Sequence, residues 1–239
     1  MFDGGPEQGI VDSREEIVEA IRYQVRYGAK VIKACVDGGK FSAEEIRIMA
    51  EEAHRREVKL ATHVWEVESV RAAVEGGADT IEHVSFIDDD TARAMIERGT
   101  VLVPTIHVST SYDLETFPPK ARERFEREMP EWRASLRLAI AAGVKIGFGS
   151  DTGEIPHGEN AKELAGLVEH GMTPLQAIRA ATLVAAEVLG VTDRGAIEAG
   201  RLADLIAVPG NPVEDVTLLQ DVRFVMKRGE VYRPEGEAP

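Results

Sequence analysis

The sequence predicts an α/β fold of about five parallel strands with helices on the outside, followed by a short C-terminal β segment. Three observations predict it. Short apolar runs alternate with amphipathic helical patterns along the first half of the chain, which is typical of parallel sheets. Glycines close most of these helical patterns. After residue 200 the apolar runs become short and are separated by turns alone, which favours antiparallel strands.

The predicted parallel strands are apolar runs that begin after a glycine or a polar turn. Pro104 would be unfavourable inside a sheet, so it predicts a strand end or an irregularity. The stretch 107–119 is expected to be irregular. The predicted strands are 29–36, 59–64, 79–84, 100–106 and 145–150.

The predicted helices begin at residues that cap helix N-termini well. Ser13 and Glu16 have the spacing of a capping box, Ser42 precedes the second helix, and Thr173 is followed by proline at the first helical position. The predicted helices cover about 14–27, 43–56, 66–76, 89–98, 119–142, 158–170 and 174–189.

Composition excludes several classes of function. The 239 residues include 42 acidic and 28 basic side chains, a net charge of −14 that repels nucleic acid. One cysteine, Cys35, allows no internal disulfide and is consistent with a reducing compartment. No apolar run has the length of a membrane span, and no start resembles a secretory signal. A cytoplasmic protein without nucleic-acid or membrane partners is therefore expected.

Four chemically active side chains end or interrupt predicted strands: Lys33, His63, His83 and Asp151. Parallel α/β proteins collect functional groups at the carboxyl ends of strands, so these side chains predict a metal site. Imidazole suits zinc, manganese, iron or cobalt, and a carboxylate completes a common ligand set. Each histidine has the alternative of a structural role. Asp151 could instead be a general base or a helix cap. Lys33 could extend its ammonium group to solvent, pair with a carboxylate, or be carbamylated by CO₂.

Three further residues are candidates for a substrate pocket: His107, Tyr112 and His157. A plain surface or loop role is an equal alternative for each of them. His54 and His170 fall on predicted helices beside polar neighbours and are expected to be solvated.

Six segments together resemble the metal-dependent amidohydrolase superfamily, in the branch of imidazolonepropionase-like enzymes and Xaa-Pro-type dipeptidases. They follow the order of that family over nearly the whole chain. The segments are VIKACVDGG, ATHVWEVESVRAAVEGGADTIEHVSFID, GTVLVPT, FGSDTG, MTPLQAIRAAT and GRLADLIAVPGNP.

The resemblance implies a TIM-type (β/α) barrel and a role for each strand-end residue. Lys33 matches a lysine that is carboxylated and bridges two metals, while His63 and His83 match histidines that bind the second metal. Asp151 matches the aspartate that touches metal and activates the hydrolytic water. The implied cofactor is one or two divalent ions, with zinc expected. Residues 1–200 would be a partial barrel, and residues 201–239 the remnant of a β-sandwich.

The sequence departs from this family because no His-x-His pair and no first three βα units precede Lys33. The five predicted strands correspond to the family's fourth through eighth. Three explanations are open: a truncated gene product that is inactive alone, a chain that pairs with a separate chain, or a self-associating chain. An uncovered half-barrel would expose a large apolar patch, so a homodimer or higher homo-oligomer is favoured.

The predicted function is metal-dependent hydrolysis of small-molecule amides, esters, lactones or phosphotriesters. An open pocket would predict promiscuous substrate acceptance, phosphotriesterase activity included. The alternative is a non-catalytic remnant that binds metal or a partner and needs a second chain for activity.

Overall fold

The computed structural model describes residues 9–83 and 86–233. The chain divides into two compact units. The first unit comprises residues 1–103 and 131–145, and the second comprises residues 104–130 and 146–239.

A four-stranded parallel sheet forms the centre of the first unit. Its strands follow one another in the order of the chain. The four earlier predicted strands are confirmed, each shorter than its apolar run. They are β1 (Val31–Cys35), β2 (Lys59–His63), β3 (Thr80–Glu82) and β4 (Val101–Val103).

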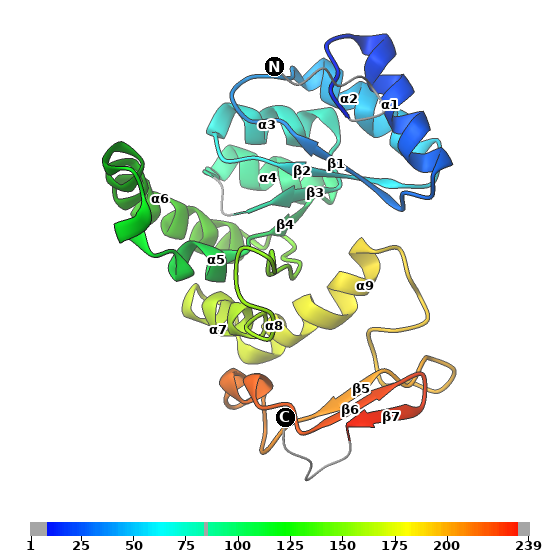
Figure 1. Cartoon of the computed structure of the whole chain (residues 1–239), viewed down its shortest axis with the longest axis vertical. Coiled ribbons are helices and arrows are strands. Elements are labelled where there is room, and N and C mark those ends of the chain that lie inside the picture. Colours follow the sequence, from blue (N-terminus) through cyan, green and yellow to red (C-terminus); the bar gives the residue numbers. More distant parts are fainter. Residues whose placement is uncertain (1–8, 84–85, 234–239) are drawn as a thin grey trace. The chain divides into compact units, whose positions relative to one another are not determined.

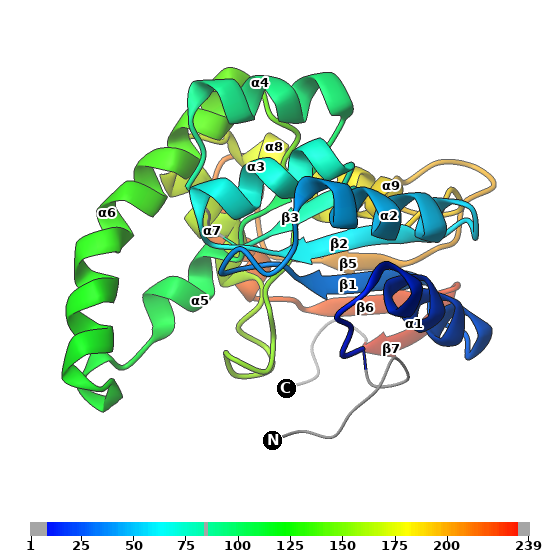
Figure 2. The same ribbon diagram turned by 90° about the horizontal axis from the view of Figure 1, so that it is seen from above.

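Four helices accompany this sheet, as the alternating pattern predicts. Figure 1 shows α2, α3 and α4 along one face of the sheet, and Figure 2 shows α1 beside β1. The helices are α1 (Arg14–Arg26), α2 (Ala43–His54), α3 (Val67–Gly76) and α4 (Asp89–Arg98).

The predicted helix caps form to different extents. Ser42 and Glu45 make both hydrogen bonds of a capping box. The Ser13 side chain accepts from the Glu16 N–H, but the Glu16 carboxylate accepts from the Asp12 N–H at 2.8 Å. The predicted box at Ser13 is therefore only half formed, because the glutamate bonds one residue further back.

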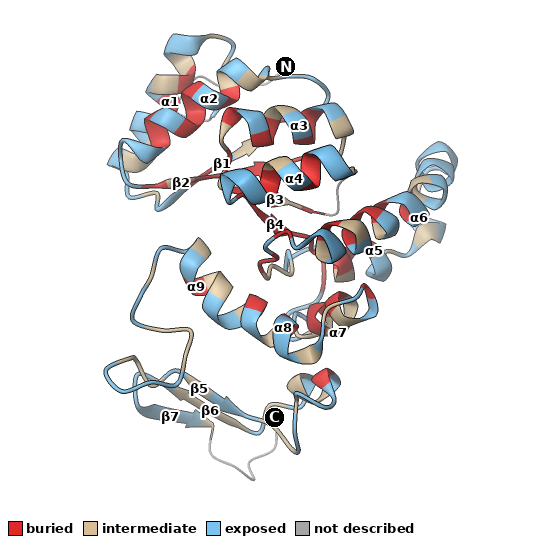
Figure 3. Ribbon diagram, turned by 180° about the vertical axis from the view of Figure 1, so that it is seen from behind, coloured by how far each residue is buried: buried red, intermediate tan, exposed pale blue. Residues whose placement is uncertain are grey.

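The core of the first unit lies where the helices meet the sheet. Leu60, Ile81 and Leu102 lie on the successive strands β2, β3 and β4 and are 0%, 0% and 1% exposed. Figure 3 shows the buried sides of α2 and α3 facing the strands. Burying an aliphatic side chain of this size contributes about 1.5–3 kcal/mol, so this layer fixes the strands from which the candidate site projects.

The predicted fifth strand is wrong as a strand. Residues 145–150 contain a single bridge position at Ile146 and are otherwise irregular. The Lys145 carbonyl accepts a hydrogen bond from the Leu102 N–H at 2.9 Å, so the segment only begins to pair beside β4. Gly147 and Gly149 follow, and glycine weakens extended pairing because it gains no side-chain packing.

The second unit is largely helical. Residue 104 ends β4, as its proline predicts, but the stretch expected to be irregular holds a short helix and a 3₁₀ turn. The helix α6 contributes residues to both units. The elements are α5 (Ile106–Ser111), η2 (Leu114–Thr116), α6 (Pro119–Ala142), α7 (Lys162–Glu169), α8 (Pro174–Arg179), a π turn (Ala180–Val184) and α9 (Ala185–Val188).

The tail forms a small antiparallel sheet in the order β5-β6-β7, which confirms the predicted C-terminal β segment. Ile206 and Tyr232 on this sheet are 54% and 64% exposed. The division into a barrel part and a sandwich remnant at residue 200 stays a prediction. Among the described residues, no helix is both long and apolar enough to cross a lipid bilayer. The tail strands are β5 (Leu205–Ala207), β6 (Phe224–Lys227) and β7 (Glu230–Arg233), with η4 (Val216–Gln220) between them.

A buried carboxylate ties α1 to α2. The Glu52 side chain is 3% exposed and accepts from Arg22 Nε at 2.7 Å, Arg56 Nε at 2.9 Å and Arg55 Nη1 at 3.1 Å. The hydrogen bond from Arg22, and then that from Arg56, hold the pKa of Glu52 below its usual range. Glu52 therefore stays ionised as the shared partner of three guanidinium groups.

Replacing Glu52 by glutamine is expected to lower the free energy of unfolding by about 2 kcal/mol, because a buried site loses its charge-assisted hydrogen bonds. Glu51→Gln is the matched control: its exposed carboxylate meets Arg55 at 3.7 Å, so the change should stay within about 0.5 kcal/mol. Urea unfolding at pH 7 measures both. Equal effects of the two substitutions would contradict a structural role for Glu52.

Candidate active site

The parallel register of β1, β2 and β3 brings two predicted ligands together. Cys35 lies opposite His63, and His63 lies opposite Glu82, the last residue of β3. His83 follows immediately, and the ring centroids of the two histidines are 4.5 Å apart. Lys33 projects from β1 two residues before Cys35 and is exposed. The imidazoles are thus neighbours, while their assignment as metal ligands stays a prediction.

The backbone of His83 turns sharply where β3 ends. Its φ of 78° lies in the left-handed region that favours glycine. The His83 N–H donates to the Val103 carbonyl at 2.8 Å, and the residue is 7% exposed. The pairing with β4 and the burial together hold a conformation that costs of order 1 kcal/mol.

The electrostatic surroundings of His83 keep its ring neutral. Burial, with smaller contributions from the nearby charges of His63 and Lys33, lowers its pKa to about 3. At neutral pH the imidazole is therefore uncharged, the form in which histidine binds metals.

Trp65, two residues after His63, contacts both imidazoles. Its indole Nε1–H donates to His63 Nε2 at 2.9 Å. Its ring stacks on His83 with centroids 5.2 Å apart and planes 3° from parallel. Trp132 lies against the same indole, with ring centroids 5.2 Å apart. An aromatic group thus joins the two histidines.

Asp37 ties the loop after β1 to the loop after β2. Its Oδ1 accepts from the Trp65 N–H at 2.6 Å and the Glu66 N–H at 3.4 Å. In return, Glu66 Oε2 accepts from the Gly38 N–H at 3.0 Å. The other carboxylate oxygen of Asp37 lies 3.5 Å from His63 Nε2. Asp37 therefore fixes where Trp65 stands relative to His63.

Asp151 lies in the second unit, in a tight turn. Its φ is 48°, and its carbonyl accepts from the Glu154 N–H at 3.1 Å. The hydroxyls of Ser150 and Thr152 are 2.7 Å apart on either side of it. The next helix begins at Lys162, so Asp151 does not cap it. Asp151 is exposed, so its carboxylate is accessible to a ligand.

Tyr112 packs against Phe117 and Phe125, with ring centroids 5.4 Å and 5.7 Å away. Burial raises the pKa of its hydroxyl, as do the negative charges of Glu154 and Asp151. Tyr112 thus shares an electrostatic environment with Asp151. His157 is exposed in the loop that follows this turn. The substrate-binding roles of Tyr112 and His157 stay predictions.

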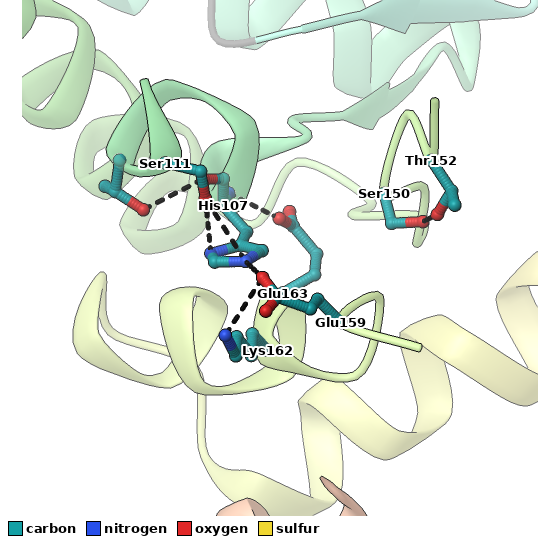
Figure 4. A network of polar contacts seen from close by, with 8 residues as sticks. His107, Ser111, Ser150, Thr152, Glu159, Lys162 and Glu163 are labelled. Carbon is teal, nitrogen blue, oxygen red and sulfur yellow. Dashed lines mark hydrogen bonds and ion pairs between the residues drawn. The ribbon is translucent and has the colours of Figure 1, made fainter. Parts of the chain in front are cut away.

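His107 belongs to a polar network between α5 and α7 (Figure 4). Its ring lies 3.2 Å from the Ser111 hydroxyl and 3.6 Å from Glu159, which also pairs with Lys162 at 2.9 Å. The Ser111 hydroxyl donates to the His107 backbone carbonyl at 2.8 Å. The network orients the imidazole of His107, and its role in a substrate pocket stays a prediction.

Glu163 caps α5 from a different helix. The residue before α5, Thr105, has a φ of 48° and makes no side-chain cap. Glu163 of α7 supplies the missing acceptor, because its carboxylate accepts from the Ile106 N–H at 2.9 Å and the His107 N–H at 2.7 Å. It is 0% exposed, and burial raises its pKa to about 7 against these hydrogen bonds.

Sequence reasoning missed Trp65, Asp37 and Glu163. Trp65 stands two residues beyond a strand-end histidine, a spacing that could have indicated contact with it. Glu163 lies in a helical pattern where a glutamate normally faces solvent, so no local pattern indicated its burial. The expectation for His170 is wrong: it is 2% exposed, and its Nδ1 is 2.7 Å from the Gly166 carbonyl. His54 is 46% exposed, as expected, and pairs with Asp79.

Within the part of the chain that the structure describes, no three His, Cys, Asp or Glu side chains are arranged to hold a metal ion. Residues 5–233 match the model of the Amidohydrolase family, which covers the strand-end histidines and the turn at Asp151. The chain belongs to the Amidohydrolase family.

Several amidohydrolases resemble this chain closely. Ochratoxinase from Aspergillus niger is 34% identical over 250 residues, which cover 96% of this chain and 52% of the enzyme. An imidazolonepropionase from Pyrobaculum arsenaticum is 29% identical, over 95% of this chain and 55% of that protein. The chain thus spans about half the length of the curated relatives it matches.

Solved amidohydrolase structures share the fold. A Xaa-Pro dipeptidase with methionine bound in its active site has a TM-score of 0.91 and 36% identity, over 98% of this chain and 62% of that one. The crystal structure of Aspergillus niger ochratoxinase has a TM-score of 0.87 over 96% of this chain and 57% of its own. The predicted fold class, part of a (β/α) barrel with a small C-terminal β segment, is confirmed.

The buried carboxylate of Glu163 predicts how stability depends on pH. The pKa of Glu163 is about 7 in the folded protein and about 4.5 when the side chain is exposed. Between pH 4.5 and pH 7 the carboxyl is therefore protonated in the folded state and ionised in the unfolded state. The contribution of Glu163 to the free energy of unfolding is therefore greatest below pH 4.5. It falls by about 3 kcal/mol as the pH rises through 7.

Comparing wild type with Glu163→Gln isolates this contribution. Urea unfolding at pH 5 and pH 7.5 should show that the substitution removes most of the pH-dependent loss, because glutamine does not titrate. Glu159→Gln serves as the control, since its partner Lys162 lowers rather than raises its pKa. If the Glu163→Gln protein loses as much stability as wild type over this range, the pKa of Glu163 is not raised.

Proposed function

We propose that this amidohydrolase is a metal-dependent hydrolase, with His63 and His83 as the centre of its metal site. The observation that carries this proposal is the 4.5 Å separation of two imidazole rings at the ends of adjacent parallel strands. One of the rings is held neutral by burial. Neutral imidazoles from separate strands are a common basis for a divalent metal site.

The side chains present in the first unit fit a divalent cation in their chemistry. Two imidazoles supply nitrogen ligands, and the exposed Lys33 is free to take up CO₂ and become an oxygen ligand if carboxylated. Lys33 is close enough to His83 for its positive charge to lower the pKa of that ring. Zinc, as one or two ions, is the proposed metal, because nitrogen and oxygen ligands of this kind suit it.

Asp151 is proposed as the fourth ligand and the proton acceptor. It lies in the second unit, and its assignment rests on the segment FGSDTG together with its exposed carboxylate. A divalent cation bound by these residues would polarise the scissile bond and lower the pKa of water to around 7. The Asp151 carboxylate would take the proton from water and pass it to the leaving group.

The proposed substrates are small molecules with an amide, ester, lactone or phosphotriester bond. Among these, an amide is favoured by the resemblance to a Xaa-Pro dipeptidase over 98% of the chain. His107, Tyr112 and His157 are proposed to contact the substrate. The Tyr112 hydroxyl, whose pKa burial raises further above neutrality, can donate a hydrogen bond to the substrate.

The first strand of the sheet supports the further proposal of homo-oligomerisation. β1 is an edge strand, and Val31 on it is 50% exposed. A hollow of about 460 Å³ between α1 and β1 has a mainly apolar lining that includes Ile17, Ile21 and Met49. An uncovered edge strand with apolar surroundings favours pairing with another polypeptide segment. A second copy of this chain is proposed to supply that segment. Light scattering at several concentrations measures the assembly state.

The alternative function is a remnant without turnover that binds metal or a partner and needs a second chain for activity. Its supporting observation is that no three His, Cys, Asp or Glu side chains among the described residues are arranged to hold a metal ion. Metal analysis of the purified protein and an activity assay separate the two. Bound metal without hydrolysis of any substrate class would favour the remnant.

Asp151→Ala is expected to lower the hydrolysis of a Xaa-Pro dipeptide by about 10²- to 10⁴-fold, because the reaction loses its proton acceptor. Glu154→Gln is the matched control, since it removes a charge from the same exposed turn and should retain most activity. Steady-state kinetics of the three proteins, with and without a chelator, measure the effect. Activity that survives both the chelator and Asp151→Ala would refute the proposed mechanism.

A further inference from the structure

We propose that Trp65 is a positioning residue that holds His63 in one protonation form and competes with a divalent cation for the ring. The inference deepens the metal site described above and rests on that proposed function. It begins from the hydrogen bond of 2.9 Å between the indole Nε1–H and His63 Nε2. An indole N–H can only donate, so Nε2 must be the unprotonated, accepting nitrogen.

This contact determines where the proton of a neutral His63 ring lies. With Nε2 accepting, the proton is on Nδ1. An oxygen of Asp37 also lies near Nε2, but at 3.5 Å it is at the limit of a hydrogen bond. Asp37 instead receives the Trp65 backbone N–H at 2.6 Å, so it anchors the indole rather than the imidazole.

A metal ion cannot bind His63 while this hydrogen bond persists. A cation needs an unprotonated ring nitrogen. If it takes Nε2, it takes the lone pair that the indole N–H occupies. If it takes Nδ1, the ring proton must move to Nε2, where two N–H groups would face each other. The Trp65–His63 bond is lost in both cases, whichever nitrogen the cation uses.

The stacking contacts make Trp65 suited to this role. Its ring lies parallel to His83, 5.2 Å from it, and against Trp132 at the same centroid distance. Releasing the hydrogen bond leaves these ring contacts available to the indole. Trp65 therefore orders the two imidazoles before a cation binds, and its hydrogen bond to His63 lowers the affinity for that cation.

The first experiment needs no metal. Two-bond ¹H–¹⁵N correlation spectra of the histidine rings, assigned with His63→Gln, should show His63 with its proton on Nδ1 in wild type and in Trp132→Phe. In Trp65→Phe the ring keeps its aromatic neighbour but loses the N–H donor, so the population with the proton on Nε2 should rise. A wild-type His63 protonated on Nε2 overturns the proposal.

The second experiment measures Zn²⁺ affinity by competition with a chromophoric chelator. Trp65→Phe should bind Zn²⁺ about fivefold more tightly than wild type, the equivalent of one hydrogen bond, whereas Trp132→Phe should match wild type. Unchanged or weaker binding by Trp65→Phe overturns the competition.

The chain has two tryptophans, so Trp132→Phe leaves Trp65 as the one emitter. Its fluorescence should change saturably with Zn²⁺, over the same concentration range as the chelator competition. Saturable binding without any change in Trp65 emission or in the ring-nitrogen spectrum overturns the proposal. If neither wild type nor Trp65→Phe takes up Zn²⁺, the proposed function fails, and the metal-free spectrum alone decides whether Trp65 positions His63.

Discussion

The parallel pairing of β1, β2 and β3 is the constraint on which the candidate site of the first unit depends. Because the strands run in one direction, their carboxyl ends form one row, and the side chains that follow them meet. Cys35 stands opposite His63 and His63 opposite Glu82, so His83 is the next residue along that row. A slip of one residue in this register would send the His63 side chain to the other face of the sheet.

The sequence predicted the elements that this constraint produces, and it missed the contacts made across them. Alternating apolar runs and capped helices identify β1 to β4 and α1 to α4, because each is a local pattern with its own end signals. The segment 145–150 failed as a strand because its apolar character says nothing about the partner it needs. The contact of Trp65 with both histidines depends on register and on the anchoring by Asp37, which no local pattern encodes.

Two buried carboxylates also have properties that local sequence patterns did not predict. Glu52 and Glu163 both lie in helical patterns where a glutamate is expected to face water, and both are almost fully buried. Their surroundings give them opposite properties. Arg22 and Arg56 hold Glu52 ionised, whereas the Glu163 carboxylate accepts from two backbone N–H groups and burial raises its pKa to about 7. Burial and partner identity are tertiary properties, and they decide the charge state that a sequence leaves open.

Two of the positions that the chemistry singles out have a strained backbone. Most residues with positive φ in the described structure are glycines, but five are not: His83, Asp151, Glu57, Thr105 and Arg228. Each costs of order 1 kcal/mol, and glycine would remove that cost. At His83 and Asp151 a side chain capable of metal or proton chemistry occupies a place where glycine would be more stable. Retaining an imidazole and a carboxylate there is easiest to understand if the side chain itself is what the position requires.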